Sequence, residues 1–139
     1  MSLRTWLAKR FRTKSLGERG EDVATRFLKK QGYAILTRHL DLPQGELDII
    51  AVDGRTVVFV EVKTRQSTAA GAPTEAIDDR KQQRMSQAAL VYLKSQGLLN
   101  YAARFDVIAI LWPADERRPT QIEHIKNAFE VHGRGQFFA

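Results

Sequence analysis

Three charged residues stand within two strongly apolar segments of the chain. Asp48 lies in the run Glu46–Val52, and Glu61 and Lys63 end the run that begins at Val57. Burying a carboxylate or an ammonium among apolar side chains is costly unless the charge is paired or ligates a metal. Two converging carboxylates are a typical protein contribution to a Mg²⁺ site, whose other positions go to water and phosphate.

A hard cation between Asp48 and Glu61 would give this trio a chemical role. Such a cation polarises a phosphoryl group and lowers the pKa of its bound water. Lys63 would then orient that water or offset charge on the phosphate in the transition state. The plainer alternative is a buried ion pair, or a strand end that emerges into solvent at Thr64. An E-x-K pattern alone is common and does not separate these interpretations.

The spacing of the residues indicates which elements would bring the trio together. Side chains alternate along a strand, so Glu61 and Lys63 share one face, and Asp48 shares a face with Ile50. Asp53-Gly54 is a hairpin turn signal between the two runs. The two strands are therefore predicted to be neighbours, which would place Asp48 beside Glu61.

The remaining pattern predicts a mixed sheet between helices. Ser15 and Glu18 form a capping box for a helix to about Gln31, with Gly32 suited to the left-handed position that follows. Glu21 borders the buried stripe of this helix. The pattern further predicts strands over 33–39, 46–52, 56–64 and 105–111, a helix over 75–96 and a short strand over 121–125. The order is α-β-β-β-α-β, with a further β if the last strand forms, in a three-layer α/β/α arrangement.

These residues, in this order, resemble a known superfamily. Asp48 followed after a hairpin by Glu61-x-Lys63 is similar to the signature of the PD-(D/E)xK, or restriction-endonuclease-like, superfamily. The chain more closely resembles the YraN family of bacterial proteins, over roughly residues 15–130. The similar stretches are 17–21, 45–51, 58–65, 104–107 and 124–129.

The resemblance implies a restriction-endonuclease-like fold related to Holliday-junction resolvases. It assigns catalytic roles to Glu21, Asp48, Glu61 and Lys63, with Asp48, Glu61 and Glu21 as metal ligands. Mg²⁺ or Mn²⁺ would be the cofactor. Leu47 stands where the superfamily's signature has proline.

Basic residues are concentrated at the N-terminus. Residues 1–14 form a basic arm with no acidic residue, whose charges are Arg4, Lys9, Arg10, Arg12 and Lys14, whereas residues 15–139 hold 17 basic and 16 acidic residues. Leu3, Trp6, Leu7 and Phe11 recur in the arm at helical spacing. Three interpretations stay open: an amphipathic helix docked on the domain or a frayed tail, an arm that binds nucleic-acid phosphates, and a helix that lies on anionic lipid.

Composition narrows the class of protein. A chain of 139 residues with 43% apolar residues fits one domain, here 15–139 with a short tail at 133–139. Without a run of about 18 apolar residues, no stable membrane insertion is expected. The chain has no cysteine, which excludes disulfides and thiolate metal sites and fits a cytoplasmic location.

Several further residues have two interpretations. Lys81 borders the apolar stripe of its helix and either approaches a phosphate or extends over the core into solvent. Glu46 is either a supporting acid of the site or a strand-start residue. Asp106 is expected to pair with a basic residue rather than to bind metal. His39, His124 and His132 lack ligand spacing and are expected to be structural or exposed.

Three hypotheses follow for the activity. The first is a metal-dependent nuclease that hydrolyses phosphodiester bonds in DNA, branched or flapped DNA included, with DNA favoured over RNA. Its phosphate contacts would be the five basic residues of the arm together with Arg65 and Lys81. The second is a module that binds nucleic acid or a DNA-processing partner without cutting. The third is a membrane-surface or scaffold module that uses residues 1–14. A homodimer is compatible with all three.

Overall fold

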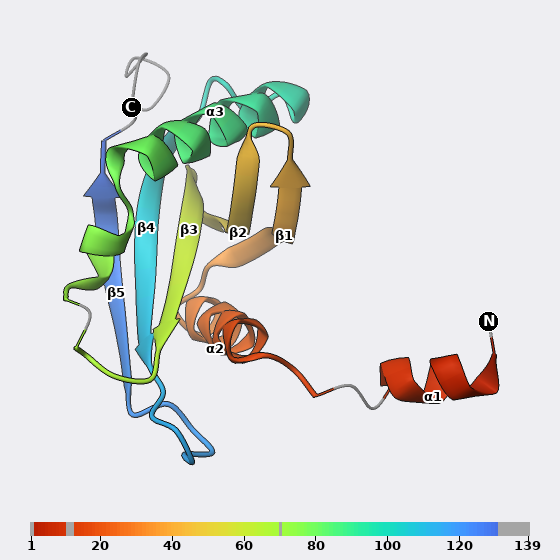
Figure 1. Ribbon diagram of the computed structural model, residues 1–139. Helices are drawn as coiled ribbons and strands as arrows, with labels where there is room; N and C mark the ends of the chain where they lie inside the picture. The colour runs from red at the N-terminus through yellow and green to blue at the C-terminus, as the bar shows by residue number, and fades with distance from the viewer. Residues whose placement is uncertain (1, 11–12, 70, 131–139) are drawn as a thin grey trace.

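The computed structural model describes residues 2–10, 13–69 and 71–130, and its centre is a five-stranded sheet (Figure 1). The strands are β1 (Ala34–Leu42), β2 (Gly45–Asp53), β3 (Thr56–Arg65), β4 (Ala102–Leu111) and β5 (Gln121–Phe129). They lie side by side in chain order, with β3 and β4 parallel and the other neighbours antiparallel. Parallel strands need a long crossover, which helix α3 (Asp79–Ser95) supplies between β3 and β4.

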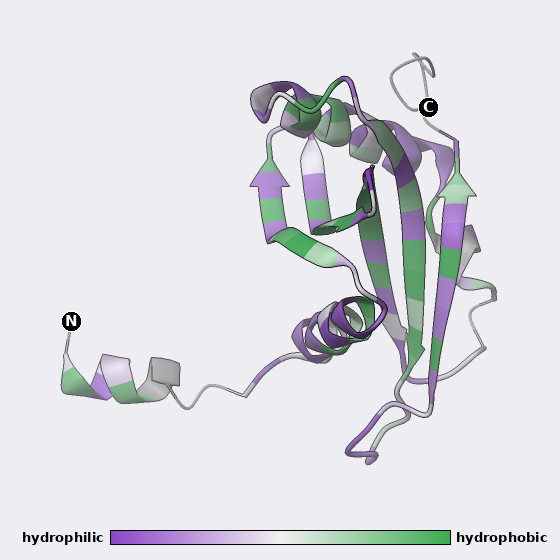
Figure 2. Cartoon of the chain, turned by 180° about the vertical axis from the view of Figure 1, so that it is seen from behind, coloured by the Kyte–Doolittle hydropathy of each residue, from purple (hydrophilic) through white to green (hydrophobic). Residues whose placement is uncertain are grey.

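Helices cover both faces of this sheet. Helix α2 (Leu16–Lys30) packs on one face through Val23, Ala24 and Leu28. Helix α3 packs on the opposite face through Met85, Ala88, Ala89 and Leu93. Figure 2 shows long apolar stretches in the central strands β3 and β4, which helices cover on both faces, and alternating apolar and polar residues along the outer strand β5. The predicted fold class, a three-layer α/β/α arrangement around a mixed sheet, is confirmed.

Helix α2 begins and approaches the sheet as its sequence predicts. The Ser15 side chain accepts a hydrogen bond from the Glu18 amide, the Glu18 carboxylate accepts one from the Ser15 amide, and Gly32 follows the helix with a φ of 91°. Gly20 lies against β3, because a Cβ at this position would come 1.9 Å from the Thr64 hydroxyl. Only glycine allows this approach, which sets α2 directly over the strand that carries Glu61.

The hairpin between β2 and β3 also forms as predicted, but β2 contains an irregularity at Asp48. Asp53 pairs with Thr56 across the turn. Leu47 and Ile50 are three residues apart, yet both pack in the cluster on the α3 face, so the strict alternation of side chains is interrupted between them. The interruption brings Asp48 to the point where β2 and β3 begin to separate.

The helix expected over 75–96 starts later than predicted. Pro73–Ala76 forms a short 3-10 turn, and α3 begins at Asp79 with Asp78 as its N-cap, the Asp78 side chain accepting a hydrogen bond from the Lys81 amide at 2.9 Å. Glu75 therefore does not begin the helix. A capping aspartate outweighs the general helix propensity of the preceding residues. The later start places Lys81 in the first turn of α3.

The expected pairing of Asp106 is confirmed within β4. Its fully buried carboxylate accepts hydrogen bonds from Arg104 Nε at 3.0 Å and the Asn127 amide at 2.9 Å, and lies 2.8 Å from His124 Nε2. Burial alone would lower the pKa of Arg104, but hydrogen bonds to Asp106 and Asp53 raise it. This network joins β4 to β5 and gives His124 the structural role that was expected.

The N-terminal helix lies outside the packed layers. Helix α1 (Leu3–Arg10) forms in the basic arm, and its Leu3, Trp6 and Leu7 are 72%, 48% and 40% exposed, so they are not core residues. Strand β5 is longer than the predicted short strand and reaches Phe129. Phe11, Arg12, His132 and the tail 133–139 lie outside the described residues.

Candidate functional site

Glu61 is the buried acid at the centre of the candidate site. Its side chain lies on the α3 face of β3 and is 7% exposed. Burial and the negative charge of Asp48 raise the pKa of Glu61 to about 7, although Lys81 acts in the opposite direction. A carboxyl group in this state takes up positive charge readily, either as a proton or as a cation.

Asp48 stands beside Glu61 at the point where the two strands separate. The last paired residues of β2 and β3 at this end are Ile49 and Val60. Beyond them the Val62 amide donates its hydrogen bond to the Asp48 carboxylate, at 2.9 Å, in place of a strand partner. One oxygen of Asp48 is thereby fixed by the backbone of β3, close enough to Glu61 to raise its pKa. The two acids that the hairpin was expected to bring together are adjacent.

Lys81, rather than Lys63, is the cation that pairs with Glu61. Its Nζ lies 2.5 Å from Glu61 Oε1. Burial lowers the pKa of Lys81, but the charges of Glu61, Asp48 and Glu46 raise it more. The interpretation that Lys81 merely extends over the core is therefore wrong, since its ammonium points back into the acidic cluster.

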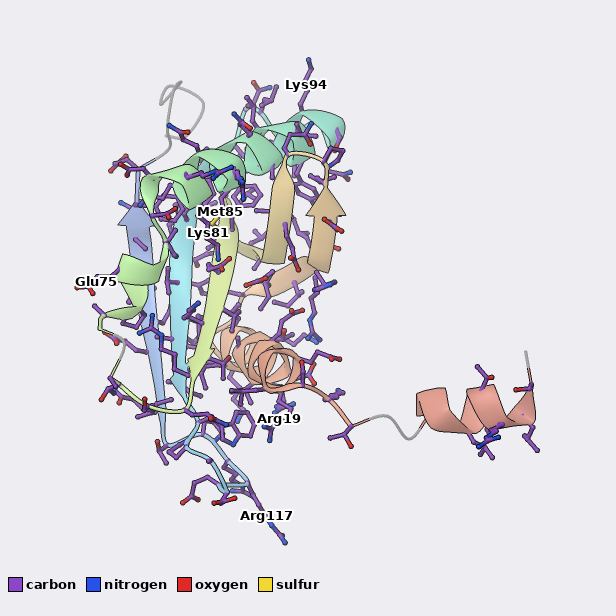
Figure 3. The ribbon with its side chains drawn as sticks, in the orientation of Figure 1. Arg19, Glu75, Lys81, Met85, Lys94 and Arg117 are labelled. Carbon is purple, nitrogen blue, oxygen red and sulfur yellow. The ribbon has the colours of Figure 1, made fainter. Side chains whose placement is uncertain are left out.

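An open cavity of about 440 Å³ lies in front of these residues, between β2, β3 and the first turns of α3. We call it the carboxylate hollow, and it is lined by Gly45, Glu46, Asp48, Glu61, Asp78, Arg80, Lys81, Arg84 and Met85. Figure 3 shows Lys81 and Met85 projecting from α3 over the sheet. Three cations thus line the same space as the buried Glu61 and the partly buried Asp48.

Arg80 and Arg84 were not among the predicted site residues. They stand four apart on α3 and therefore share one helical face, next to Lys81. The sequence contains this four-residue spacing, but the spacing alone does not indicate that the two arginines lie at the site, because that depends on where α3 packs on the sheet. Only the packing of the helix across the end of β2, where Gly45 approaches the Arg84 carbonyl, shows that this face lines the hollow.

Glu21 lies beside this site but is engaged elsewhere. Its carboxylate pairs with Arg38 Nε at 3.2 Å and lies 3.8 Å from His39 Nδ1. Burial raises the pKa of Glu21, Arg38 opposes this shift, and the charge of Asp48 adds to it. Among the described residues, no three His, Cys, Asp or Glu side chains are arranged to hold a metal. The assignment of Glu21 as a third ligand therefore stays a prediction.

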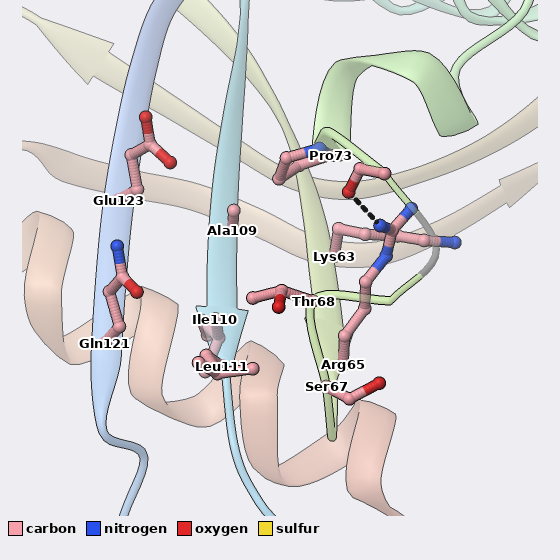
Figure 4. Close-up of a pocket in the computed structure, with 11 residues that line it drawn as sticks. Lys63, Arg65, Ser67, Thr68, Pro73, Ala109, Ile110, Leu111, Gln121 and Glu123 are labelled. Carbon is pink, nitrogen blue, oxygen red and sulfur yellow. Dashed lines mark hydrogen bonds between the residues drawn. The ribbon is translucent and has the colours of Figure 1, made fainter.

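Lys63 occupies the same face of β3 as Glu61 but lines a different cavity. This second cavity, of about 110 Å³, lies between β3, β4, β5 and the loop that follows β3 (Figure 4). Lys63 forms no ion pair with any residue in the described ranges. Arg65, the next residue on this face, donates a hydrogen bond from Nη1 to the Gly71 carbonyl at 2.7 Å. Both cations flank the carboxylate hollow along the strand.

The other predicted contacts are distributed around the molecule. Glu46 lines the hollow and lies 3.3 Å from His39 Nδ1, so it belongs to the surroundings of the site. In the arm, Arg4 is exposed on α1, and Lys14 pairs with Asp22 at 2.6 Å. The side chains of Lys9 and Arg10, and Arg12 as a whole, lie outside the described residues.

Comparison with known proteins settles the family. The model of the uncharacterised protein family UPF0102 matches residues 20–110. The chain belongs to UPF0102, the YraN family. It is 53% identical to a UPF0102 protein of Geotalea daltonii over 118 residues, covering 85% of this chain and 91% of that protein. It is also 43% identical to a UPF0102 protein of Rhodopirellula baltica, covering 88% of this chain and 75% of the relative.

Membership of UPF0102 agrees with the fold and confirms the resemblance drawn from the sequence. The YraN family belongs to the restriction-endonuclease-like superfamily, and the five-stranded mixed sheet between α2 and α3 is consistent with that fold. The matched residues include Asp48, Glu61, Lys63 and Lys81. None of the described helices is both long and apolar enough to cross a bilayer.

Proposed function

We propose that this UPF0102 protein is a divalent-metal-dependent nuclease that hydrolyses phosphodiester bonds in nucleic acid, with DNA as the favoured substrate. The observation that carries the proposal is the carboxylate hollow. There a buried Glu61, its pKa raised to about 7 by burial and by Asp48, shares an open space with Arg80, Lys81 and Arg84. A fold does not need an acid pair of this kind for packing, and perturbed acids in an open site are typical of functional centres.

The donor set fits a hard divalent cation. Asp48 and Glu61 offer carboxylate oxygens from adjacent strands, which Mg²⁺ and Mn²⁺ prefer over nitrogen. The mutual repulsion that raises the pKa of Glu61 is what a shared cation would relieve. Asp48 and Glu61 would hold the ion, with Glu21 able to approach if it leaves Arg38. When bound, such an ion supplies polarisation of the phosphodiester and a lower pKa for its water.

The cations of the site have separate roles in this proposal. Without a metal ion, Lys81 neutralises Glu61. Lys81 would lose this role to a divalent cation held by Asp48 and Glu61, and its ammonium would then be free to bind a substrate phosphate. Arg80 and Arg84 face the same hollow and suit two-point contacts to the phosphates on either side of the bond to be cut. Lys63 stands next along β3, where its ammonium offsets charge that develops on the phosphate.

A second candidate function is a non-catalytic nucleic-acid-binding module on the same fold. The specific observation in its favour is the ion pair between Lys81 and Glu61, because a buried acid that already has a lysine partner can serve structure alone. This candidate predicts phosphate binding through Arg80 and Arg84 that needs no metal and survives loss of Asp48.

Cleavage assays separate the two candidates. Linear, nicked, flapped and four-way-junction DNA are incubated with the protein in Mg²⁺, in Mn²⁺ and in chelator. We expect metal-dependent cutting that Asp48→Asn abolishes. Asp115→Asn is the matched control, since Asp115 is an exposed loop residue whose φ of 70° asparagine also adopts. Wild-type protein that binds these substrates without cutting any of them would favour the binding module.

A further inference from the structure

The cavity beside the carboxylate hollow has features that the proposed chemistry does not use. We call it the loop cavity. Its floor is Ala109 and Leu111 of β4, Pro73 closes one side, and Gln121 and Glu123 of β5 form the opposite rim (Figure 4). Lys63 and Arg65 of β3 line its third side. An apolar floor with a few convergent polar groups is the usual composition of a site for a small organic group.

The register of the strands makes this cavity a built feature of the sheet. Ala109 pairs with Lys63 on one side and Glu123 on the other, and Leu111 pairs likewise with Arg65 and Gln121. All six side chains therefore point to one face in two rows. The middle residue of the first row is alanine, and its small side chain leaves the space between a lysine and a glutamate open. The loop after β3 is held over this space by the hydrogen bond from Arg65 to Gly71.

The loop cavity lies directly along the strand from the acid pair. Glu61, Lys63 and Arg65 are alternate residues of β3 on one face, so each step is about 6.6 Å. A nucleic-acid strand whose phosphate lies at Glu61 would pass Lys63 and Arg65 with its next nucleotide. Their two positive charges suit the phosphate backbone, and the space beyond them is apolar.

We propose that the loop cavity receives one unpaired nucleobase of the strand being cut, next to the scissile phosphate; this rests on the proposed function. The floor of Ala109 and Leu111, with Pro73 at its side, buries the faces of the base, and the Arg65 guanidinium offers a planar surface for stacking. The Gln121 amide can donate to and accept from a base edge, and Glu123 accepts from an amino group.

The consequence is a preference for substrates with unpaired nucleotides. The cavity lies between the loop and β5 and holds about 110 Å³, so a base inside a duplex cannot enter without leaving its stack, at a cost of a few kcal/mol. A single strand, a flap or a frayed end presents its bases without this cost. Intact duplex should therefore be the weaker ligand, although its phosphates can still contact the same cations.

The test measures binding without cleavage. The full-length protein in chelator is titrated into a short single strand carrying one 2-aminopurine, and into the matching duplex. We expect the fluorescence of 2-aminopurine to rise when the base leaves its neighbours for the cavity, and the single strand to bind at least about tenfold more tightly. Ala109→Met fills the floor with a flexible apolar side chain and should abolish the fluorescence rise and most of this preference.

Two further variants complete the design. Ala34→Met adds the same bulk at an exposed site of β1 outside the loop cavity, and it should behave as wild type. Gln121→Ala alters only the exposed rim, so it should fold and should change the preference among the four bases.

The outcomes separate this inference from the proposed function. Equal binding of single strand and duplex, unchanged by Ala109→Met and Gln121→Ala, overturns the base site and leaves the nuclease proposal standing. A wild-type protein that binds neither form overturns the base site, and one that also fails to cut any DNA with Mg²⁺ or Mn²⁺ overturns the nuclease proposal as well. Specific loss of single-strand binding in Ala109→Met, with duplex binding retained, supports the base site even if no DNA is cut.

Discussion

At the scale of single residues, the acid pair makes the sharpest prediction. Mg²⁺ or Mn²⁺ should raise the melting temperature of the wild type, because a ligand selective for the folded state adds about 2.7 kcal/mol at a hundred times its Kd. Asp48→Asn and Glu61→Gln should each remove most of that rise. Without metal at pH 8, the Glu61→Gln variant should be on the order of 1 kcal/mol more stable than the wild type, because the fold disfavours the charged form of Glu61. The measurement is thermal unfolding with metal and with chelator. A metal-induced rise that survives both substitutions would show that the ion binds elsewhere.

Two lysines of the site should also behave differently. Lys81→Met removes the partner of Glu61 and should cost about 1–3 kcal/mol in chelator, with added metal restoring part of it. Lys63→Met removes no ion pair within the described part of the chain and should change stability by less than about 0.5 kcal/mol, yet lower cleavage by about a hundredfold. Unfolding and cleavage are measured on the same preparations. A Lys63→Met protein that cuts normally would refute the role proposed for Lys63.

At the scale of elements, the close approach of α2 to β3 gives a matched pair of glycine variants. Gly20→Ala would put a Cβ 1.9 Å from the Thr64 hydroxyl, so we expect a loss of about 2 kcal/mol and a shift of the strand that carries Glu61. Gly17→Ala, in the same helix, meets nothing closer than Ser15 at 4.0 Å and should be neutral or stabilising by up to about 1 kcal/mol. Chemical denaturation measures both. Equal effects of the two changes would show that the contact with Thr64 is relieved without cost.

The elements also show what the sequence could and could not predict. The capping box at Ser15, the turn at Asp53-Gly54 and the strand that carries Glu61 were predicted because local chemistry determines each of them. The predicted start of α3 was wrong, because the choice of Asp78 as N-cap over an earlier residue depends on the turn at Pro73–Ala76. Lys81 and Glu61 are twenty residues apart in the chain, and the packing of α3 on the sheet brings them together. The periodicity of the sequence does not indicate which residues this packing brings into contact.

At the scale of the whole molecule, the acidic centre and the basic surface lie in different parts of the chain. The hollow and the loop cavity belong to residues 45–123, whereas the concentrated charge lies in residues 1–14. The domain itself is nearly neutral, so its cations act locally, at Arg80, Arg84, Lys63 and Arg65. Recognition of a substrate would then combine a general attraction from the arm with specific contacts at the sheet.

Deletion of residues 1–14 tests this division of roles. The deletion removes five positive charges, so nucleic-acid affinity should fall and its log–log dependence on salt should flatten by about 0.9 for each lost duplex phosphate contact. The melting temperature should change little, because Leu3, Trp6 and Leu7 are exposed and the pair between Lys14 and Asp22 lies at the surface. A full-length variant with the five basic residues changed to Gln should match the deletion if charge alone matters. Unchanged DNA binding with a collapsed melting temperature would instead make the arm part of the fold. Binding of the arm to anionic vesicles, without any effect on nucleic-acid affinity, would make it a membrane-surface helix.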